Sequence, residues 1–404
     1  MPSRAPLWAG VVACALSVPS LAAAQDARVQ DLVDLIVREG PRAAAIRADV
    51  EIAQREQSAR LVFPNPGIAY SRESAGFTEF LQFEQPLPVF GIRGALERAG
   101  VAATAAAEAE GDARLWMLRA DATRLAADLL AAQALAEATA RYVTDIERLI
   151  EVLRVREKEG EGSRFDRVRA EQELAEVRRD AVDAAVLAAN ARAAVAAFLP
   201  PGAVVPRLTG DLFETRAVPD LDTLVVRARD SRAELRALQF TADRARREAE
   251  AATRARYPQP VVMGGLKRAD NEGARQSGGV FGVSLAVPLF DTGEREAARW
   301  TAEATKTAAE QVAIEQQIRA EVAGAVEALR LRQEALADVP GVTGVEDLIG
   351  MAEVAYREGE VGIVTLLDAI RTATRIRVHE IGMRLDARLA QVALERAVGG
   401  VLWP

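Results

Sequence analysis

The chain has 404 residues, and 51 Lys and Arg against 59 Asp and Glu give it a formal charge of −8. A net-acidic chain has no global electrostatic attraction to nucleic acid, and an apolar content of 50% excludes an intrinsically disordered protein. A single Cys and a single His rule out a disulfide framework and leave almost no basis for a zinc site, a Cys–His dyad or a Ser–His–Asp triad. We expect no enzyme activity, no cofactor and no metal site.

The N-terminal segment predicts export. Residues 1–4 are basic, and residues 5–24 carry no charge and end in three alanines. This is the pattern of a signal peptide removed after residue 24. An alternative interpretation takes residues 11–14 as a lipobox with Cys14 acylated, and the sequence leaves both open. Beyond this segment no charge-free run reaches the ~18 residues of a membrane helix, so the mature chain is expected to be periplasmic, secreted or an outer-membrane β-structure.

Three short motifs occur twice in the same order, at separations of 194, 200 and 199 positions. An aromatic-Pro-x-Pro motif occupies 63–66 and 257–260, a Pro-apolar-Phe motif 88–90 and 288–290, and a Glu-Gly-Glu motif 159–161 and 358–360. Three matches in register indicate duplication of a unit of about 200 residues. We expect repeat one at 25–205 and repeat two at 220–400.

Each repeat is expected to contain a helical stretch, a proline break, two short strands, a very long helix, a glycine-centred turn and another helix. In repeat one, residues 31–60 predict helix with a break at Pro41, and two prolines at 64 and 66 end it. Its strands are expected at 67–74 and 77–86 (within about 66–88), with Ala75 and Gly76 as a tight turn between them. In repeat two the strands are expected at 261–268 and 278–288, within about 260–289.

The expected strands alternate between two kinds of side chain. Large apolar residues lie on one face, namely Leu81, Phe83, Phe281, Val283, Leu285 and Val287. The opposite face holds Phe80, Gln82, Glu84, Val280, Gly282, Ser284 and Ala286. This division is typical of strands with lipid outside and a channel inside. A half-buried hairpin of a water-soluble protein gives the same alternation, so both interpretations stay open.

The longest expected helix covers residues 94–158, which contain no proline and correspond to about 98 Å of helix. A stripe of apolar or small residues from Leu115 to Leu153 advances by three and four in strict alternation, a 3.5-residue period that predicts a left-handed supercoil. A second stripe of alanines runs beside it from Ala127 to Ala138. Two stripes predict two neighbouring helices, hence a ring or bundle, with an ordinary coiled-coil rod as the alternative.

Four segments resemble the TolC family of outer-membrane efflux proteins. They are residues 63–66 (Phe-Pro-Asn-Pro), the junction 85–94 (Gln-Pro-Leu-Pro-Val-Phe-Gly-Ile-Arg-Gly), its counterpart 287–293 (Val-Pro-Leu-Phe-Asp-Thr-Gly) and residues 356–369 (Tyr-Arg-Glu-Gly-Glu-Val-Gly-Ile-Val-Thr-Leu-Leu-Asp-Ala). The run from Pro340 to Tyr356 is similar to the heavy-metal efflux branch, the CzcC and CusC type. The resemblance covers essentially residues 30–400.

The resemblance implies a mainly α-helical homotrimer with a small β part. Each chain would give four strands to one 12-stranded transmembrane β-barrel in the outer membrane and helices to a long α-helical barrel in the periplasm. The strands favour oligomerisation independently of the resemblance, because four strands cannot close a barrel and unclosed sheet edges are not viable in lipid. The implied function is a passive exit duct of a tripartite RND-type efflux system for small toxic solutes or metal cations. An inner-membrane pump would supply the energy, and a periplasmic adaptor would dock on the helical tips.

The two Glu-Gly-Glu turns are the expected tips. Glycine there allows the positive φ that a short helix reversal needs. The residues expected to contact the adaptor are Gly160, Glu161, Gly162, Glu358, Gly359 and Glu360. Charged residues are also expected at any solvated hairpin end.

The pore residues come from the same resemblance. Asp368 matches the Asp of the family's Leu-Asp-Ala motif, which faces the inner constriction in relatives. Three copies would form an acidic ring that attracts cations, and Asp166 would add a second ring. The alternative is that Asp368 pairs with Arg371 or Arg375 on its own helix.

The gate departs from the family pattern. Val361 stands where the archetypal channel has an arginine of its salt-bridge latch, and Thr365 stands at the position of another gate acid. The remaining latch is Tyr356, through apolar contact or a hydrogen bond. The competing function is a periplasmic coiled-coil scaffold or adaptor without membrane insertion, for which four outward-apolar strands would have no use.

Overall fold

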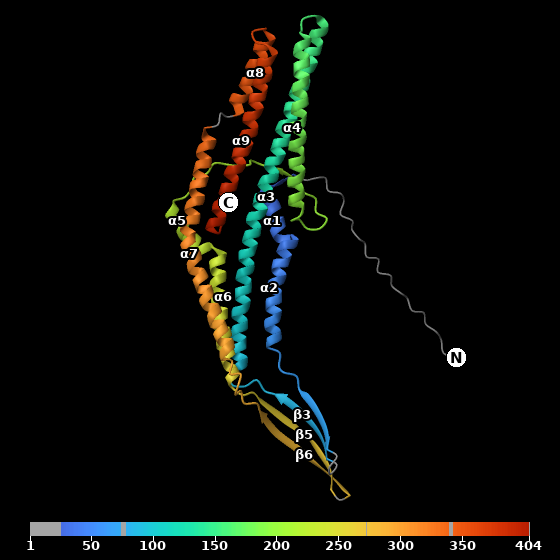
Figure 1. Ribbon diagram of the computed structural model, residues 1–404, viewed down its shortest axis with the longest axis vertical. Helices are drawn as coiled ribbons and strands as arrows, with labels where there is room; N and C mark the ends of the chain where they lie inside the picture. Colours follow the sequence, from blue (N-terminus) through green and yellow to red (C-terminus); the bar gives the residue numbers. More distant parts are fainter. Residues whose placement is uncertain (1–25, 74–77, 272, 339–341, 404) are drawn as a thin grey trace, which may run out of the picture.

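The computed structural model describes residues 26–73, 78–271, 273–338 and 342–403. The predicted signal peptide, the Cys14 alternative and the predicted turn at Ala75 and Gly76 lie outside these residues. The helices form a long, narrow rod that carries a β-sheet at one end and two helical hairpin turns at the other (Figure 1).

The first half of the chain contains two short helices, two sheet strands and a long helical hairpin. In order these are β1 (Asp26–Arg28), α1 (Val29–Glu39), α2 (Pro41–Arg60), β2 (Gly67–Glu73), β3 (Thr78–Pro86), α3 (Ile92–Glu159) and α4 (Arg164–Ala196). The predicted helix with a break at Pro41 is confirmed as the pair α1 and α2. The predicted long helix is confirmed as α3, whose 68 residues correspond to about 100 Å.

The second half follows the same order with two differences, an added 3₁₀ turn before its strands and a divided long helix. Its elements are β4 (Arg207–Thr209), α5 (Leu221–Ser231), α6 (Ala233–Ala252), the 3₁₀ turn η1 (Thr253–Arg256), β5 (Pro260–Asn271), β6 (Ala274–Leu285), α7 (Glu294–Ala337), α8 (Val342–Arg357) and α9 (Ile363–Val398). The expectation of a single very long helix in this repeat is wrong, since α7 and α8 are two helices. Pro340 lies between them in the sequence, and a proline inside a helix removes a hydrogen bond and clashes with the preceding turn.

The sheet combines strands from both halves in the order β2-β3-β5-β6, with every pair antiparallel. The expected strand boundaries in repeat two are partly wrong. β6 begins four residues earlier than expected and ends before Pro288, which has no N–H to donate to a ladder. β5 extends beyond residue 268 because β6 pairs with it up to the hairpin, where Asn271 faces Ala274.

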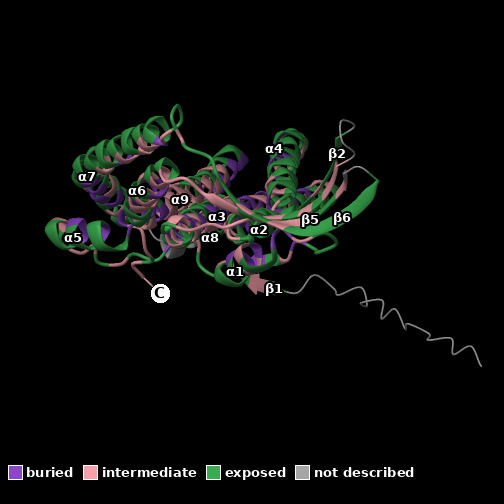
Figure 2. Cartoon of the chain, turned by 90° about the horizontal axis from the view of Figure 1, so that it is seen from below, coloured by how far each residue is buried: buried purple, intermediate pink, exposed green. Residues whose placement is uncertain are grey.

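One face of this sheet is apolar across all four strands, as the alternation predicted. The register aligns Tyr70, Leu81 and Leu266, and it aligns Val262 with Val283 and Gly264 with Phe281. Phe281 is 89% exposed, and Ile68, Phe83 and Val283 are also exposed, so nothing in the described chain covers this face (Figure 2). A half-buried soluble hairpin would place this face against its own core.

The seams of α3 hold the helices together. From Leu118 to Leu153 most members of the predicted stripe are buried, and Ala127, Ala131 and Ala138 of the second stripe are buried too. The helix packs against α1, α2, α4, α6 and α9, so the prediction of more than one neighbour is confirmed. Across the described ranges, none of the helices is both long enough and apolar enough to span a membrane.

The break between α1 and α2 depends on a close backbone approach. A Cβ on Gly40 would lie 2.4 Å from the Ile36 carbonyl oxygen and 2.7 Å from that of Phe198 at the end of α4. The guanidinium of Arg42 stacks on the Phe198 ring at 3.9 Å, which fixes the same contact from the other side. The end of α4 therefore packs directly on the α1–α2 junction.

We expect Gly40→Ala to destabilise the protein by roughly 1–3 kcal/mol, because two backbone carbonyls must move to admit one methyl group. Gly324→Ala is the matched control. Gly324 lies in the middle of α7 with open space around its Cα, so alanine there should be neutral or stabilising by up to ~1 kcal/mol. Thermal unfolding of the purified mature protein, followed by circular dichroism, measures both. Equal transition temperatures for the two variants would contradict the close approach.

Candidate functional site

The two hairpin turns have nearly the same backbone geometry. Gly160 and Gly359 end α3 and α8 with φ of +76° and +79°. The amide of Glu161 donates to the Arg156 carbonyl at 3.0 Å, and that of Glu360 donates to the Ala355 carbonyl at 2.9 Å. These are glycine-terminated helix ends in which the following residue closes the last turn. The predicted tip turns are therefore present at the end of the rod opposite the sheet (Figure 1).

Four tip acids project into solvent. Glu159, Glu161, Glu358 and Glu360 are exposed, and none of them pairs with a basic side chain in the part of the chain that the structure describes. Glu157 differs, because Arg167 bonds it at 2.6 Å. Gly162 is the more constrained of the other two tip glycines, since a Cβ on it would lie 2.8 Å from the Glu157 amide nitrogen.

The structure brings Tyr356 and Asp166 together. The Tyr356 hydroxyl of α8 donates a hydrogen bond of 3.1 Å to the Asp166 carboxylate near the start of α4. Burial and the negative charge of Asp166 both raise the pKa of Tyr356, so the hydroxyl keeps its proton at neutral pH. The Arg156 guanidinium lies over the Tyr356 ring at 5.7 Å. This contact joins the hairpin of one repeat to the hairpin of the other.

A second polar contact joins the same hairpins farther from the turn. The Glu173 side chain of α4 is 2% exposed and accepts a hydrogen bond of 2.9 Å from the Tyr142 hydroxyl of α3. Arg371 of α9 donates from Nε to the same carboxylate at 3.0 Å and pairs with its other oxygen through Nη2. Sequence reasoning missed this cluster, because residues 142, 173 and 371 lie far apart in the chain and share no motif.

The Glu173 carboxyl of this cluster stays ionised beside the Arg371 guanidinium. Burial alone would raise the pKa of Glu173, but the hydrogen bonds from Arg371 and Tyr142 outweigh it and hold the pKa below its usual value. Burial and the neighbouring carboxylate raise the pKa of Tyr142. A carboxyl whose pKa is lowered in the folded state contributes stability above its unfolded pKa of about 4.5 and loses it as the pH falls further. The cluster is therefore intact at neutral pH.

Asp368 does not pair with Arg371, because Arg371 is engaged with Glu173. Asp368 is exposed on α9, and within the described ranges its carboxylate makes no hydrogen bond or ion pair. Thr365 is exposed one turn before it, and Val361 is half-buried in the turn itself. The structure thus leaves the Asp368 carboxylate available, while Asp166 is engaged with Tyr356.

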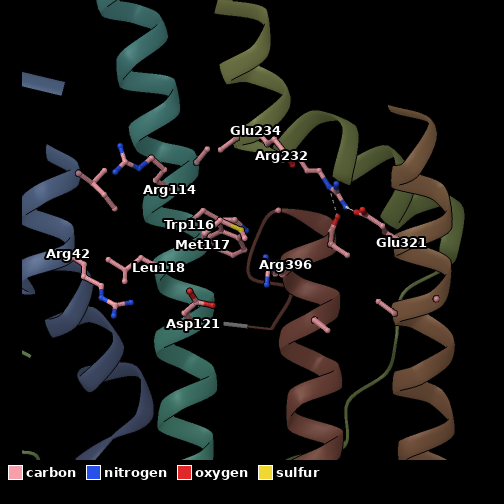
Figure 3. Close-up of a pocket in the computed structure, with 18 of the residues that line it drawn as sticks. Arg42, Arg114, Trp116, Met117, Leu118, Asp121, Arg232, Glu234, Glu321 and Arg396 are labelled. Carbon is pink, nitrogen blue, oxygen red and sulfur yellow. Dashed lines mark hydrogen bonds and ion pairs between the residues drawn. The ribbon is translucent and has the colours of Figure 1, made fainter. Parts of the chain in front are cut away.

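A pocket of about 1150 Å³ lies between helices of the two repeats (Figure 3). Trp116 and Met117 of α3 face α9 across it, and the Arg232–Glu321 ion pair lies at its edge. Its lining combines arginines and acidic residues with apolar side chains. His379 is exposed on α9, and among the described residues no group of three or more His, Cys, Asp or Glu could hold a metal ion.

Comparison with solved structures shows the fold. CusC superposes with a TM-score of 0.69 at 14% identity, covering 93% of this chain and 92% of that one. A membrane protein from Pseudomonas aeruginosa gives 0.69 at 21% identity, covering 93% and 94%. The outer-membrane protein VceC of Vibrio cholerae gives 0.65 at 20% identity, covering 93% and 97%. Because several channels match equally well, the heavy-metal branch stays a prediction.

Comparison of the sequence points the same way. Residues 224–400 match the family described as "Outer membrane efflux protein", whereas no curated protein matches the chain. Members of that family are outer-membrane channels with large periplasmic helical portions, and this chain has the same division between a terminal sheet and long helices. Residues 224–400 thus carry the sequence pattern of the outer membrane efflux protein family, and the described chain as a whole has the fold of outer-membrane channels.

Proposed function

We propose that this protein is the passive outer-membrane exit duct of a tripartite RND-type efflux system, which exports small toxic solutes or metal cations. The observation that carries the proposal is the four-stranded sheet, apolar and uncovered on one face, at the far end of the rod from the hairpin tips. Exposed apolar surface of this kind is costly in water and is favourable in lipid.

The sheet supports assembly into a trimer. Strands β5 and β6 have 12 residues each, which is long enough to cross a bilayer when tilted. The outer strands β2 and β6 have no further strand beside them among the described residues. In lipid, unpaired backbone groups cost several kcal/mol each, so a spanning sheet must close on itself. Three chains would close a barrel of twelve strands.

The helices support a duct through the periplasm. α3 runs without interruption from the sheet to the tip, a length of about 100 Å. A ring of such helices would continue the barrel lumen toward the inner membrane, where a pump would load the cargo. The duct itself then needs no energy source and no cofactor.

The tips support an adaptor contact. The four exposed tip glutamates form an acidic end on each chain, and a groove of about 660 Å³ lies beside them between α3 and the α8–α9 hairpin. Leu149 and Val152 of α3 line this groove together with Ile349 of α8. Three arginines and three acidic residues also line the groove, so an adaptor hairpin with an apolar stripe flanked by charges of both signs would fit it.

The Tyr356–Asp166 hydrogen bond supports a latch at the gate. This hydrogen bond joins the two hairpins of a chain close to their turns, and it would replace the salt-bridge latch whose arginine position holds Val361. Breaking it would free the α8–α9 hairpin from α4 near the tip. The Glu173 cluster would remain as the hinge point, because it holds α9 against α3 and α4 farther along.

The membrane orientation predicts different outcomes for two neighbouring valines. Val283→Arg places a charge on the apolar outer face and should reduce or abolish assembly in outer membranes, at a cost of up to ~2–4 kcal/mol per chain at the bilayer centre. Val280→Arg, on the opposite face of β6, is the matched control and should assemble normally. The measurement is the mass of detergent-extracted particles from the outer-membrane fraction.

If the detergent-extracted wild-type particle has the mass of three chains, the result supports the proposed exit duct. A water-soluble monomer or dimer in the periplasmic fraction would favour the scaffold alternative, and so would equal behaviour of the two valine variants.

We expect Tyr356→Phe and Asp166→Ala to raise the open probability of the channel in planar bilayers. Loss of a partly exposed hydrogen bond worth ~1 kcal/mol shifts an equilibrium about fivefold per chain. Tyr70→Phe removes a tyrosine hydroxyl from the sheet and serves as the control with unchanged conductance. A Tyr356→Phe channel that conducts like wild type would exclude the latch.

An acidic ring of Asp368 predicts that Asp368→Asn lowers the ratio of cation to anion permeability. Asp230→Asn is the control, since Asp230 is an exposed acid on α5, far from the tips. Reversal potentials in a salt gradient measure the ratio. If both variants keep the wild-type ratio, Asp368 does not line the constriction.

A further inference from the structure

Aromatic and arginine side chains gather where the strands meet the helices. We call them the junction cluster: Phe63, Phe90, Arg93, Arg254, Arg256 and Tyr257. They come from three separate segments: one follows α2, one contains the start of α3, and one joins α6 to β5. The cluster lies at the end of the sheet nearer the rod (Figure 1).

The contacts within the cluster are mainly between rings and guanidinium groups. The rings of Phe90 and Tyr257 lie 6.4 Å apart. Arg254 and Arg256 approach the Tyr257 ring at 6.0 and 5.1 Å, and Arg93 lies 6.0 Å from the Phe63 ring. Such contacts orient a cation without neutralising its charge.

The three arginines of the cluster make no ion pair with any carboxylate of the described chain. Other arginines of the described chain, such as Arg141, Arg229 and Arg330, also lack an ion pair, so the junction arginines are distinguished by their place among aromatic rings beside the sheet. Arg60, three positions before Phe63, bonds the buried Glu248 at 2.6 and 2.9 Å. The junction cluster therefore holds three positive charges that the chain itself does not compensate.

Phe90 combines a strained backbone with an exposed side chain. Phe90 has a φ of +58° and is the one residue other than glycine with a positive φ in the described part of the chain. This conformation costs of order 1 kcal/mol for a side chain with a Cβ. The ring is nevertheless 57% exposed, and Phe290, its counterpart in repeat two, is 99% exposed. Exposing either aromatic side chain to water is unfavourable in free energy.

We propose that the junction cluster binds the phosphate groups of acidic phospholipids in the leaflet that faces the periplasm. This rests on the proposed insertion of the sheet in the outer membrane. The apolar face of the sheet ends where the cluster begins, so the cluster would lie at headgroup depth. Exposed aromatic rings are favourable at that depth, and uncompensated guanidinium groups pair with phosphate.

Selectivity among lipids follows from charge. In phosphatidylethanolamine the ammonium group of the headgroup neutralises the phosphate, so the headgroup has no net charge. The headgroup of phosphatidylglycerol has a net negative charge and attracts arginine more strongly. The cluster should therefore enrich phosphatidylglycerol over phosphatidylethanolamine around the assembled protein, and salt should weaken the enrichment. Arginines that already pair with acids would not contribute.

The test uses the full mature protein, assembled and reconstituted in vesicles of equal parts phosphatidylethanolamine and phosphatidylglycerol. Patches containing the protein are excised with an amphipathic polymer, and the ratio of the two lipids is measured by mass spectrometry. We expect about threefold enrichment of phosphatidylglycerol for the wild type in ~0.1 M salt, falling toward the bulk ratio in ~0.5 M salt.

Two sets of variants separate position from charge. Arg93→Gln, Arg254→Gln and Arg256→Gln together should return the lipid ratio to that of the bulk. The control triple is Arg141→Gln, Arg229→Gln and Arg330→Gln, three exposed arginines of the helical rod with no carboxylate partner among the described residues. It makes the same change in net charge and should keep the enrichment. Replacing the cluster arginines by lysine should keep most of it.

Vesicle flotation is measured before the lipid analysis. It distinguishes a failure of the proposed membrane insertion from a failure of the proposed lipid site. A wild-type protein that does not float with vesicles overturns membrane insertion and the lipid site with it. A protein that floats but holds the two lipids in their bulk ratio overturns the lipid site alone. Equal loss of enrichment in both triple variants would assign the effect to net charge and would also overturn the site.

Discussion

The two outer strands of the sheet, β2 and β6, each present a row of backbone N–H and C=O groups that no other described strand satisfies. In water such an edge invites aggregation, and in lipid it is prohibitively costly. The uncovered apolar face requires lipid, and lipid requires closed edges. These two demands agree only if several copies join edge to edge, so a single chain cannot be the working unit of a membrane-spanning sheet.

The two halves of the chain meet differently along the rod. Each half has an apolar core of its own, and the halves share an apolar cluster toward the tips, where Ile150 and Leu153 of α3 pack with Leu366 of α9. Toward the tips polar groups appear between them, first the buried Glu173 with Arg371 and then the half-buried Tyr356 with Asp166. Polar contacts of this kind fix one arrangement and lose their energy over a small displacement. The contact between the two halves toward the tips is therefore both apolar and polar.

Periodic features were predictable from the sequence, whereas isolated contacts were not. The seams of α3 and the two faces of the sheet repeat every 3.5 and 2 residues, so many positions support each inference. The polar cluster depends on three residues with no repeating pattern, and β1 pairs with β4 over only three residues each. The helix break between α7 and α8 rests on one proline inside an otherwise helical pattern. Tyr356 and Asp166 were both named from the resemblance, but the hydrogen bond between them required the structure.

Pairing of β3 with β5 has a consequence for the order of events after synthesis. The two strands lie almost two hundred positions apart, and nine residues of β3 align with β5. The hairpin β2–β3 therefore emerges from export long before its neighbour exists, with an apolar face and an open edge in an aqueous compartment. Such an intermediate folds slowly and aggregates readily. A truncated chain that ends before residue 260 should therefore accumulate as insoluble material.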